Sequence, residues 1–293
     1  MNAPQPHPAP LPLFQPRRAA FWLFLLLVVA GLSTVGQTLL SGLRVMPVSA
    51  LAGAAAWALY TLPLLWIFRR LGVFRGQTAA PFVLAFAWGG LGAVFLALPA
   101  NQAMFGILSK LVSPEFCHTW GPAIAGPTDE EPLKLIGVIL LLLIAPGRFR
   151  TISSVMALGF VVGLGFQVVE DYFYTVSTAL NHPNAHQLEP VVQILVLRGG
   201  FCGPWSHAAY TAIASFGVGY FVARRDLPTG RRLGVAALAL LTAWALHGFW
   251  NSPALGSLME GLTILLYFPL KGLPVLLAAL LLWRVARHEK TAV

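Results

Sequence analysis

Charge is what this sequence has least of. Asp, Glu, Lys and Arg make up 10% of the 293 residues, whereas a soluble domain carries about a quarter. A soluble globular protein is therefore excluded. Only two cysteines occur, Cys117 and Cys202, both near the predicted outer face, where a disulfide could form. Two unpaired thiols are the simpler interpretation. Short alternating strands are also lacking, which excludes a transmembrane β-barrel.

What the sequence has instead is hydrophobic length. Hydrophobic residues make up 57% of the chain, and they gather in runs of about 20 residues, enough to cross roughly 30 Å of hydrocarbon. The sequence thus predicts an all-α polytopic membrane protein in a lipid bilayer, with about eight transmembrane helices. The eight runs cover about 20–43, 48–68, 80–104, 130–146, 152–178, 201–223, 233–251 and 262–283.

The basic residues orient the predicted helices. The net charge is +9, which in a soluble protein would suggest nucleic-acid binding. With the N-terminus inside, however, 14 of the 19 basic residues fall on the cytoplasmic side of the membrane. This is the positive-inside pattern, so we expect cytoplasmic termini, contact with anionic lipid and no nucleic-acid partner. The five of the 19 basic residues outside the pattern are Arg44, Lys110, Lys134, Arg198 and Lys271.

The chain reads as a single membrane domain, 19–287, between two cytoplasmic tails. The Pro-rich segment 1–18 is expected to be disordered and lacks the charged start of a signal peptide, so the first helix is interpreted as an uncleaved anchor. Residues 288–293 form the second tail. Two longer connections lie outside, and one of them, 106–128, precedes the fourth helix. The other contains an apolar stretch, 188–197, that predicts a short interfacial or re-entrant helix.

Polar residues within the apolar runs are the candidate functional residues, because an ionisable group in hydrocarbon is costly unless it is paired or faces a polar cavity. The predicted topology places those of four helices at a similar depth, near the extracytoplasmic side. Such convergence indicates a site. They are Glu130, Glu131 and Lys134 on the fourth helix, Glu170 and Asp171 on the fifth, His207 on the sixth, and His247 and Asn251 on the seventh.

Structural explanations compete with this interpretation. Thr128 and Glu131 fit a capping box, and acids in a first turn suit the helix dipole. Glu170 and Asp171 could mark the outer end of a helix, and a lone histidine is usually a neutral core residue. Lys271 is expected to snorkel to the interface. The glycines of the fifth and sixth helices predict close helix packing.

Two carboxylates and two imidazoles suit a divalent metal, zinc above all. The sequence has no HExxH motif, so the ligands would come from separate helices, which helix bundles allow. We predict Glu170, His207 and His247 as ligands. Glu130 is then the base that activates water, as an uncoordinated glutamate does in zinc proteases. A metal-free variant is also sound, in which Glu130 activates water and Asn251 with a histidine stabilises the oxyanion.

These motifs, in this order, resemble the PrsW family of intramembrane proteases. EEPLK, which holds Glu130, Glu131 and Lys134, matches an EExxK motif, and Phe166 to Glu170 matches FxxxE. Arg198 with the segment up to His207 and Thr211, followed by HGFWN, is similar to the later histidine motifs of the family. The resemblance spans about 128–252. The family is related to the CAAX prenyl proteases.

The resemblance implies cleavage of single-pass membrane proteins, such as anti-sigma factors in bacterial stress signalling, near the outer face of the bacterial cytoplasmic membrane. By position it assigns Glu130 and Glu131 to the first motif, and Glu170, His207 and His247 to the following ones. One departure is Asn251, where the family pattern has an acid and the CAAX proteases have asparagine. That departure weakens a metal site and favours an oxyanion role for Asn251.

Three questions remain open at the level of sequence. Neighbouring helical residues point about 100° apart, so Glu130 and Glu131 cannot both face one cavity; we favour Glu130 as the base and Glu131 as a capping or metal-binding residue. A proton-coupled transporter is the main alternative function, although no internal repeat is found and the polar groups gather near one face. A non-catalytic scaffold of the same fold is the other. The oligomeric state is left undetermined.

Overall fold

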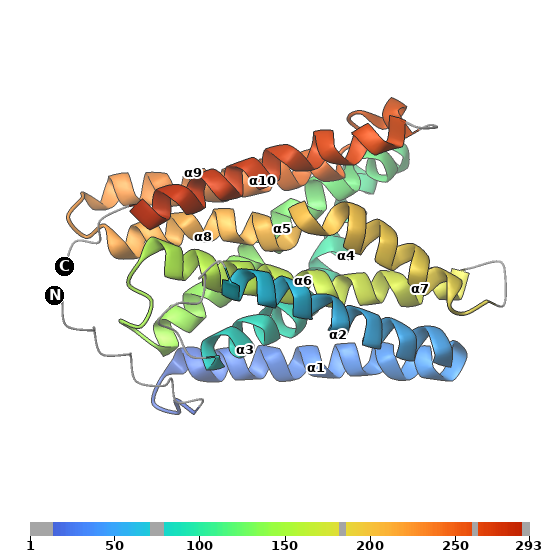
Figure 1. Ribbon diagram of the computed structural model, residues 1–293, viewed down its shortest axis with the longest axis horizontal. Helices are drawn as coiled ribbons and strands as arrows, with labels where there is room; N and C mark the ends of the chain where they lie inside the picture. The colour runs from blue at the N-terminus through green and yellow to red at the C-terminus, as the bar shows by residue number, and fades with distance from the viewer. Residues whose placement is uncertain (1–13, 71–78, 182–185, 260–262, 289–293) are drawn as a thin grey trace.

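The computed structural model describes residues 14–70, 79–181, 186–259 and 263–288, and within them all regular structure is helical (Figure 1). The predicted all-α class is therefore confirmed. Residues 1–13 and 289–293, which hold most of the two predicted tails, lie outside the described residues. The α-helices are α1 (Ala19–Val45), α2 (Pro47–Arg70), α3 (Ala80–Ala87), α4 (Val94–Leu111), α5 (Pro114–Ile144), α6 (Ile152–Asn181), α7 (Glu189–Ile194), α8 (His207–Ala223), α9 (Thr229–Asn251) and α10 (Ile264–His288).

Six of these helical segments are long and apolar enough to cross a membrane. They include one continuous stretch, Ala80–Leu111, in which the π-helical turn η1 (Trp88–Ala93) joins α3 to α4. The two remaining predicted spans correspond to α5, which carries the acidic motif, and α8, which has 17 residues. The structure thus supports a multi-pass membrane protein, while the count of eight crossings and their orientation stay predictions.

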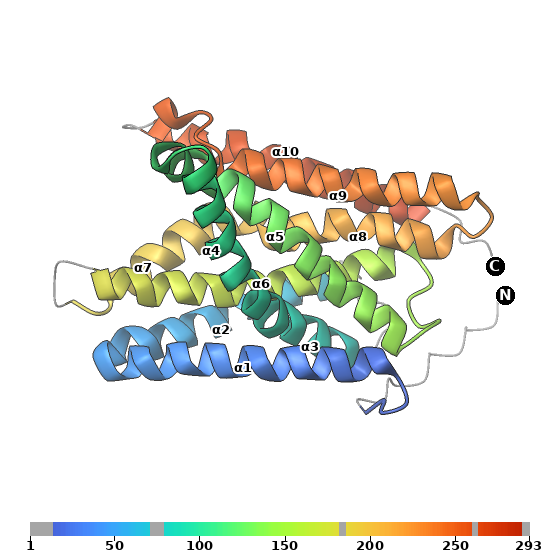
Figure 2. The ribbon, with the colours of Figure 1, turned by 180° about the vertical axis from the view of Figure 1, so that it is seen from behind.

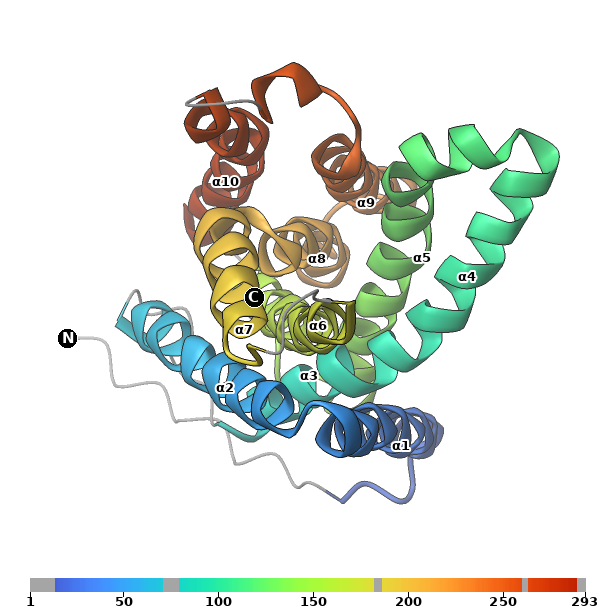
Figure 3. The same ribbon diagram turned by 90° about the vertical axis from the view of Figure 1, so that its right-hand side faces the viewer.

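Helix α6 lies at the centre of the bundle, with α1, α2, α3, α5 and α8 around it (Figure 3). Its most extensive packing is against α8. Gly159 and Gly163 make this approach possible, because a methyl group at either position would overlap the Ser215 side chain or the backbone of His207. The predicted close packing of small residues is confirmed at this crossing.

Helix α5 begins much earlier than predicted. Its N-cap is Ser113, whose hydroxyl accepts a hydrogen bond from the Phe116 amide, and the helix is continuous from Pro114 to Ile144. The predicted loop 106–128 is therefore wrong, and so is the capping box at Thr128. The three acids lie in the middle of a helix, where neither capping nor the N-terminal dipole explains them. Figure 2 shows α4 running obliquely across the bundle beside this long α5.

Prolines shape the half of α5 that was predicted to be a loop. The helix contains Pro122, Pro127 and Pro132, and each lacks the amide that would bond to the carbonyl four residues earlier. The carbonyl that Pro127 leaves free is that of Ala123, and Gly248 of α9 packs directly against it. Packing between α5 and α9 thus takes place where the helix backbone is least regular.

The segment before α8 is a series of short irregular helices. The predicted short helix at 188–197 is confirmed as α7, which continues into the π-helix η2 (Leu195–Cys202) and then the 3₁₀ turn η3 (Gly203–Trp205). The predicted span starting at 201 was too long at its beginning, since α8 starts at His207. A π-helix departs from the α-helical register, and such turns often occur at functional sites.

Helix α1 begins and α10 ends at the same end of the bundle, which also holds the α5–α6 and α8–α9 loops (Figure 1). This agrees with an even number of crossings. Cys117 and Cys202 are free thiols, as the simpler interpretation had it. Lys271 does not snorkel: its side chain is completely buried and donates to the Ser252 carbonyl at 2.7 Å and to the Tyr267 hydroxyl at 3.2 Å.

Candidate active site

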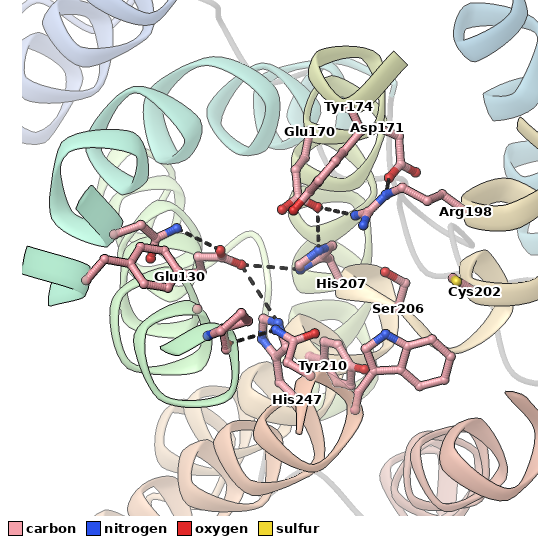
Figure 4. A pocket seen from close by; sticks show the side chains of 16 residues that line it. Glu130, Glu170, Asp171, Tyr174, Arg198, Cys202, Ser206, His207, Tyr210 and His247 are labelled. Atoms are coloured by element: carbon pink, nitrogen blue, oxygen red, sulfur yellow. Dashed lines mark hydrogen bonds and ion pairs between the residues drawn. The ribbon is translucent and has the colours of Figure 1, made fainter. Parts of the chain in front are cut away.

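Six of the eight polar residues singled out in the sequence line one small cavity of about 170 Å³, and the other two, Lys134 and Glu131, contact His207 and His247 of its lining. Its walls come from α4, α5, α6, η2, α8 and α9, and Figure 4 shows the side chains that line it. From the loops at the basic end, about 14 to 19 residues lead to each of Glu130, Glu170, His207 and His247, or about 21–28 Å at 1.5 Å per residue. These four residues therefore lie at a similar distance from the basic end of the bundle, while their depth in a membrane stays a prediction.

Glu130 stands at the middle of the cavity wall with two differently placed oxygens. Its Oε1 accepts a hydrogen bond of 3.0 Å from the Asn101 amide of α4. Its Oε2 is buried and has no hydrogen-bond partner among the described residues. That oxygen lies 3.6 Å from Nδ1 of His207 and 4.0 Å from Nε2 of His247. One oxygen is therefore anchored, and the other faces both imidazoles (Figure 4).

Glu131 points away from the cavity toward α8 and α9, as the 100° step between neighbouring residues requires. Its Oε1 accepts from Lys134 Nζ at 2.6 Å and lies 2.8 Å from His247 Nδ1. A carboxylate can only accept, so Nδ1 of His247 carries the proton and Nε2 is left facing Glu130. Lys134 has no exposed surface and is 3.8 Å from Glu130, so its closer partner is Glu131.

His207 is held from both sides of its ring. Nδ1 lies 2.9 Å from Lys134 Nζ, and Nε2 lies 2.9 Å from Glu170 Oε2. An ammonium can only donate, so Nδ1 accepts and Nε2–H donates to the carboxylate. Both histidines therefore have a carboxylate behind them, Glu131 for His247 and Glu170 for His207.

Arg198, on η2, holds the acidic pair of α6. Its guanidinium bonds to Glu170 Oε2 at 2.6 Å and to Asp171 Oδ1, and it lies 4.0 Å from the centre of the Tyr174 ring (Figure 4). Two neighbouring carboxylates in a poorly solvated place repel each other unless a cation lies between them. Arg198 therefore fixes Glu170, and through it the ring of His207.

Space at the centre of the site depends on Gly126 of α5. A methyl group there would lie 3.2 Å from Asn251 Nδ2, 3.6 Å from Glu130 Oε1 and 3.7 Å from His247 Nε2. Asn251 lines the cavity and donates from Nδ2 to the Pro122 carbonyl at 3.1 Å. Its amide has a second N–H, which is not used in that bond. A small molecule in the cavity is thus within reach of an acid, an imidazole and an amide.

Asn101 and Tyr210 are among the residues of the cavity wall that were not identified from the sequence. Asn101 was an available signal, since it is an amide near the end of the predicted span 80–104. Tyr210 gave none, because a tyrosine in an apolar helix is common. In the structure its ring stacks on His247, with centroids 4.7 Å apart and an interplanar angle of 7°.

The donor set fits a divalent metal in part. Ligand atoms of Glu130, His207 and His247 lie within 4.8 Å of one another, and zinc binds imidazole nitrogen and carboxylate oxygen. A carboxylate behind each histidine is the usual arrangement for orienting metal ligands. Lys134, however, takes the Nδ1 lone pair of His207. Glu170 is not in this group of three, since it lies behind His207.

A family model for the PrsW family intramembrane metalloproteases matches residues 78–283, more than two thirds of the chain. The matched range includes every residue placed around the cavity, Asn101 among them. It does not favour the transporter or the scaffold. No curated protein and no solved structure matches the chain.

Proposed function

The chain belongs to the PrsW family of intramembrane metalloproteases and is a peptidase, and from this we propose that it hydrolyses membrane-anchored proteins near the extracytoplasmic face of a bacterial cytoplasmic membrane. The proposed substrates are single-pass proteins such as anti-sigma factors. The similar distance of the polar residues from the basic loops supports cleavage near that face.

The observation that carries the mechanism is the buried Glu130 Oε2, which faces two imidazoles without a hydrogen bond of its own among the described residues. We propose that this oxygen accepts the proton of the attacking water. The Asn101 amide holds the other oxygen, so the carboxylate cannot rotate away. A positioned base of this kind contributes about 10²–10⁴-fold in rate.

His207 and His247 would hold the metal, which we propose to be zinc, with Glu130 left uncoordinated as the base; such a zinc would lower the pKa of water and polarise a carbonyl. Binding at His207 needs the Nδ1 lone pair that now accepts from Lys134. We assign Glu170, predicted to be a ligand, to the carboxylate behind His207, because its Oε2 is bonded to that ring and to Arg198. Glu131 has the same role for His247.

Lys134 and Asn251 are assigned supporting roles. The Lys134 ammonium neutralises Glu131 and lies 3.8 Å from Glu130, so the site does not hold two unpaired carboxylates. Asn251 has an N–H beyond the one bonded to Pro122, and we propose that it donates to the oxyanion of the tetrahedral intermediate. The proton held by Glu130 then passes to the leaving amine as the peptide bond breaks.

The test is Glu130→Gln, which keeps the shape of the side chain. We expect cleavage of a membrane-anchored reporter to fall by about 10²-fold or more while the protein stays folded. Glu115→Gln is the matched control, because Glu115 lies in the first turn of the same helix, far from the cavity, and we expect full activity. The metal content of wild type, Glu130→Gln and His247→Ala is measured beside cleavage. Full activity of Glu130→Gln would refute the proposed base.

A further inference from the structure

Beside the active-site cavity lies a second hollow of a different kind. It is a groove of about 780 Å³ between α2 and η2, and its lining is almost entirely apolar. Figure 3 shows α2 alongside α7 and the segment that follows it. The one hydroxyl of the groove, that of Tyr60, already donates to the Gly199 carbonyl at 3.1 Å. The lining of the groove includes Ala56, Leu59, Tyr60, Leu195, Gly199 and Gly200.

The groove and the active-site cavity share one wall, the π-helix η2. Arg198 and Cys202 of this segment line the cavity, whereas Leu195, Gly199 and Gly200 line the groove. This segment thus has a polar side toward the acids of α6 and an apolar side toward α2. Whatever lies in the groove is separated from the cavity by this one backbone segment, about one helix diameter or 10 Å.

The lining of the groove includes an exposed glycine, Gly200, which has no other described atom within 4 Å of the position where a side chain would begin. Gly199 beside it is buried under the rings of Tyr60 and Trp57, and neither glycine has a positive φ that only glycine adopts. Ala56 adds a small residue on the α2 side. Small residues allow two helix backbones to approach closely, and in a bilayer such packing drives helix association.

We propose that this groove binds the transmembrane helix of the substrate. The proposal rests on the proposed function, because it concerns the membrane anchor of the protein that is cleaved. An apolar helix lying on Ala56 and Gly200 would continue, at its outer end, into an extended segment that crosses η2 to the cavity. The wall that the groove shares with the cavity is the reason to assign it to the substrate, and a lipid chain in the groove is an outcome that the experiments distinguish.

Gly200→Leu tests the groove without touching the cavity, because the new side chain would occupy open space within it. Two substrates are compared with the purified full-length protein: a membrane-anchored reporter, and a short water-soluble peptide with the same cleavage sequence. We expect kcat/KM for the anchored reporter to fall about tenfold, the loss of roughly 1.4 kcal/mol of binding. Cleavage of the peptide is expected to stay unchanged.

Gly36→Leu is the matched control. Gly36 lies on α1 and likewise has nothing within 4 Å, so both substrates should be cleaved as by the wild type. An equal fall for both substrates with Gly200→Leu, or no fall for either, would overturn the proposal. A bound lipid displaced by Gly200→Leu without a change in the ratio of the two activities would overturn it as well.

A binding measurement separates this proposal from the proposed function. In the Glu130→Gln background no cleavage is needed, and the anchored reporter is titrated onto the protein in nanodiscs. We expect Gly200→Leu to raise its Kd about tenfold and Gly36→Leu to leave it unchanged. If the wild type cleaves neither substrate, the proposed function fails, while a Kd for the reporter that Gly200→Leu raises would still support docking. A Kd that Gly200→Leu leaves unchanged refutes docking alone.

Discussion

Helices α6 and α1 are similar in length and hydropathy, but they differ in how much of each is buried in the structure. They have 30 and 27 residues, and their most apolar stretches have mean hydropathies of 2.0 and 2.2. Of those stretches, 83% of the residues are buried in α6 and 17% in α1. Hydropathy therefore identifies a membrane helix but does not say whether that helix is central or peripheral.

The distinction lies in the small and polar residues. Gly159 and Gly163 let α6 approach α8, and Glu170 and Asp171 connect it to η2. By contrast, only four of the 27 residues of α1 are buried. A central helix thus bears groups that cannot face lipid, whereas a peripheral helix needs only an apolar surface. Three pairs of substitutions test how far this difference governs stability.

The largest difference is expected between two lysines that are both completely buried, Lys134 in α5 and Lys271 in α10. Lys134→Met would leave Glu131 without its ion pair, and removing one partner of a buried pair costs about 3–5 kcal/mol. Lys271→Met takes a donor from two neutral oxygens and leaves no charge behind, so its loss stays below about 3 kcal/mol. The free energy of unfolding is measured by denaturant titration in detergent.

Glu131→Gln combined with Lys134→Met provides the check on cause. If the unpaired carboxylate is responsible, the double variant should recover much of the stability that Lys134→Met loses. Equal losses for the two lysine variants would contradict the distinction between the central and peripheral positions.

The second pair compares glycines on α6 and α1. In Gly163→Ala the new methyl group would overlap the His207 backbone, so α6 and α8 must separate. Overpacking of this kind costs about 1–3 kcal/mol. It also moves His207, so cleavage should fall with stability. Gly36→Ala, in open space on α1, should not reduce stability. Thermal unfolding in detergent measures the stability of both variants. A Gly163→Ala protein as stable as the wild type would refute the close crossing.

Much of the site could be predicted from sequence because charge in an apolar run is rare enough to be informative. Glu130, His207 and His247 were identified that way, and they do meet. The beginning of α5 could not be predicted, since Pro122 and Pro127 with the neighbouring glycines are typical of a loop by propensity alone. Packing against α4 and α9 overrides that propensity.

The environment of Lys271 could not be predicted from the sequence either. Within the predicted span 262–283 a lysine is expected to reach the interface, but the Ser252 carbonyl and the Tyr267 hydroxyl hold it inside. Ser252 follows the last residue of α9 and belongs to a different part of the chain. Nothing in the local sequence of α10 indicates that partner, because only the packing of the two helices brings it close.

The smallest effect is expected for two tryptophans of α2, one of them buried against α6 and the other exposed. Trp57 of α2 is 1% exposed, and its indole N–H donates to the Thr175 hydroxyl of α6 at 2.9 Å, whereas Trp66 of the same helix is 57% exposed. Trp57→Phe loses one buried hydrogen bond, about 1 kcal/mol, and Trp66→Phe should change the free energy of unfolding by less. Thr175 also bonds to the Asp171 carbonyl at 2.8 Å, so Trp57→Phe should lower cleavage slightly. Equal stabilities for the two tryptophan variants would mean that the hydrogen bond from Trp57 to Thr175 adds nothing to the attachment of α2.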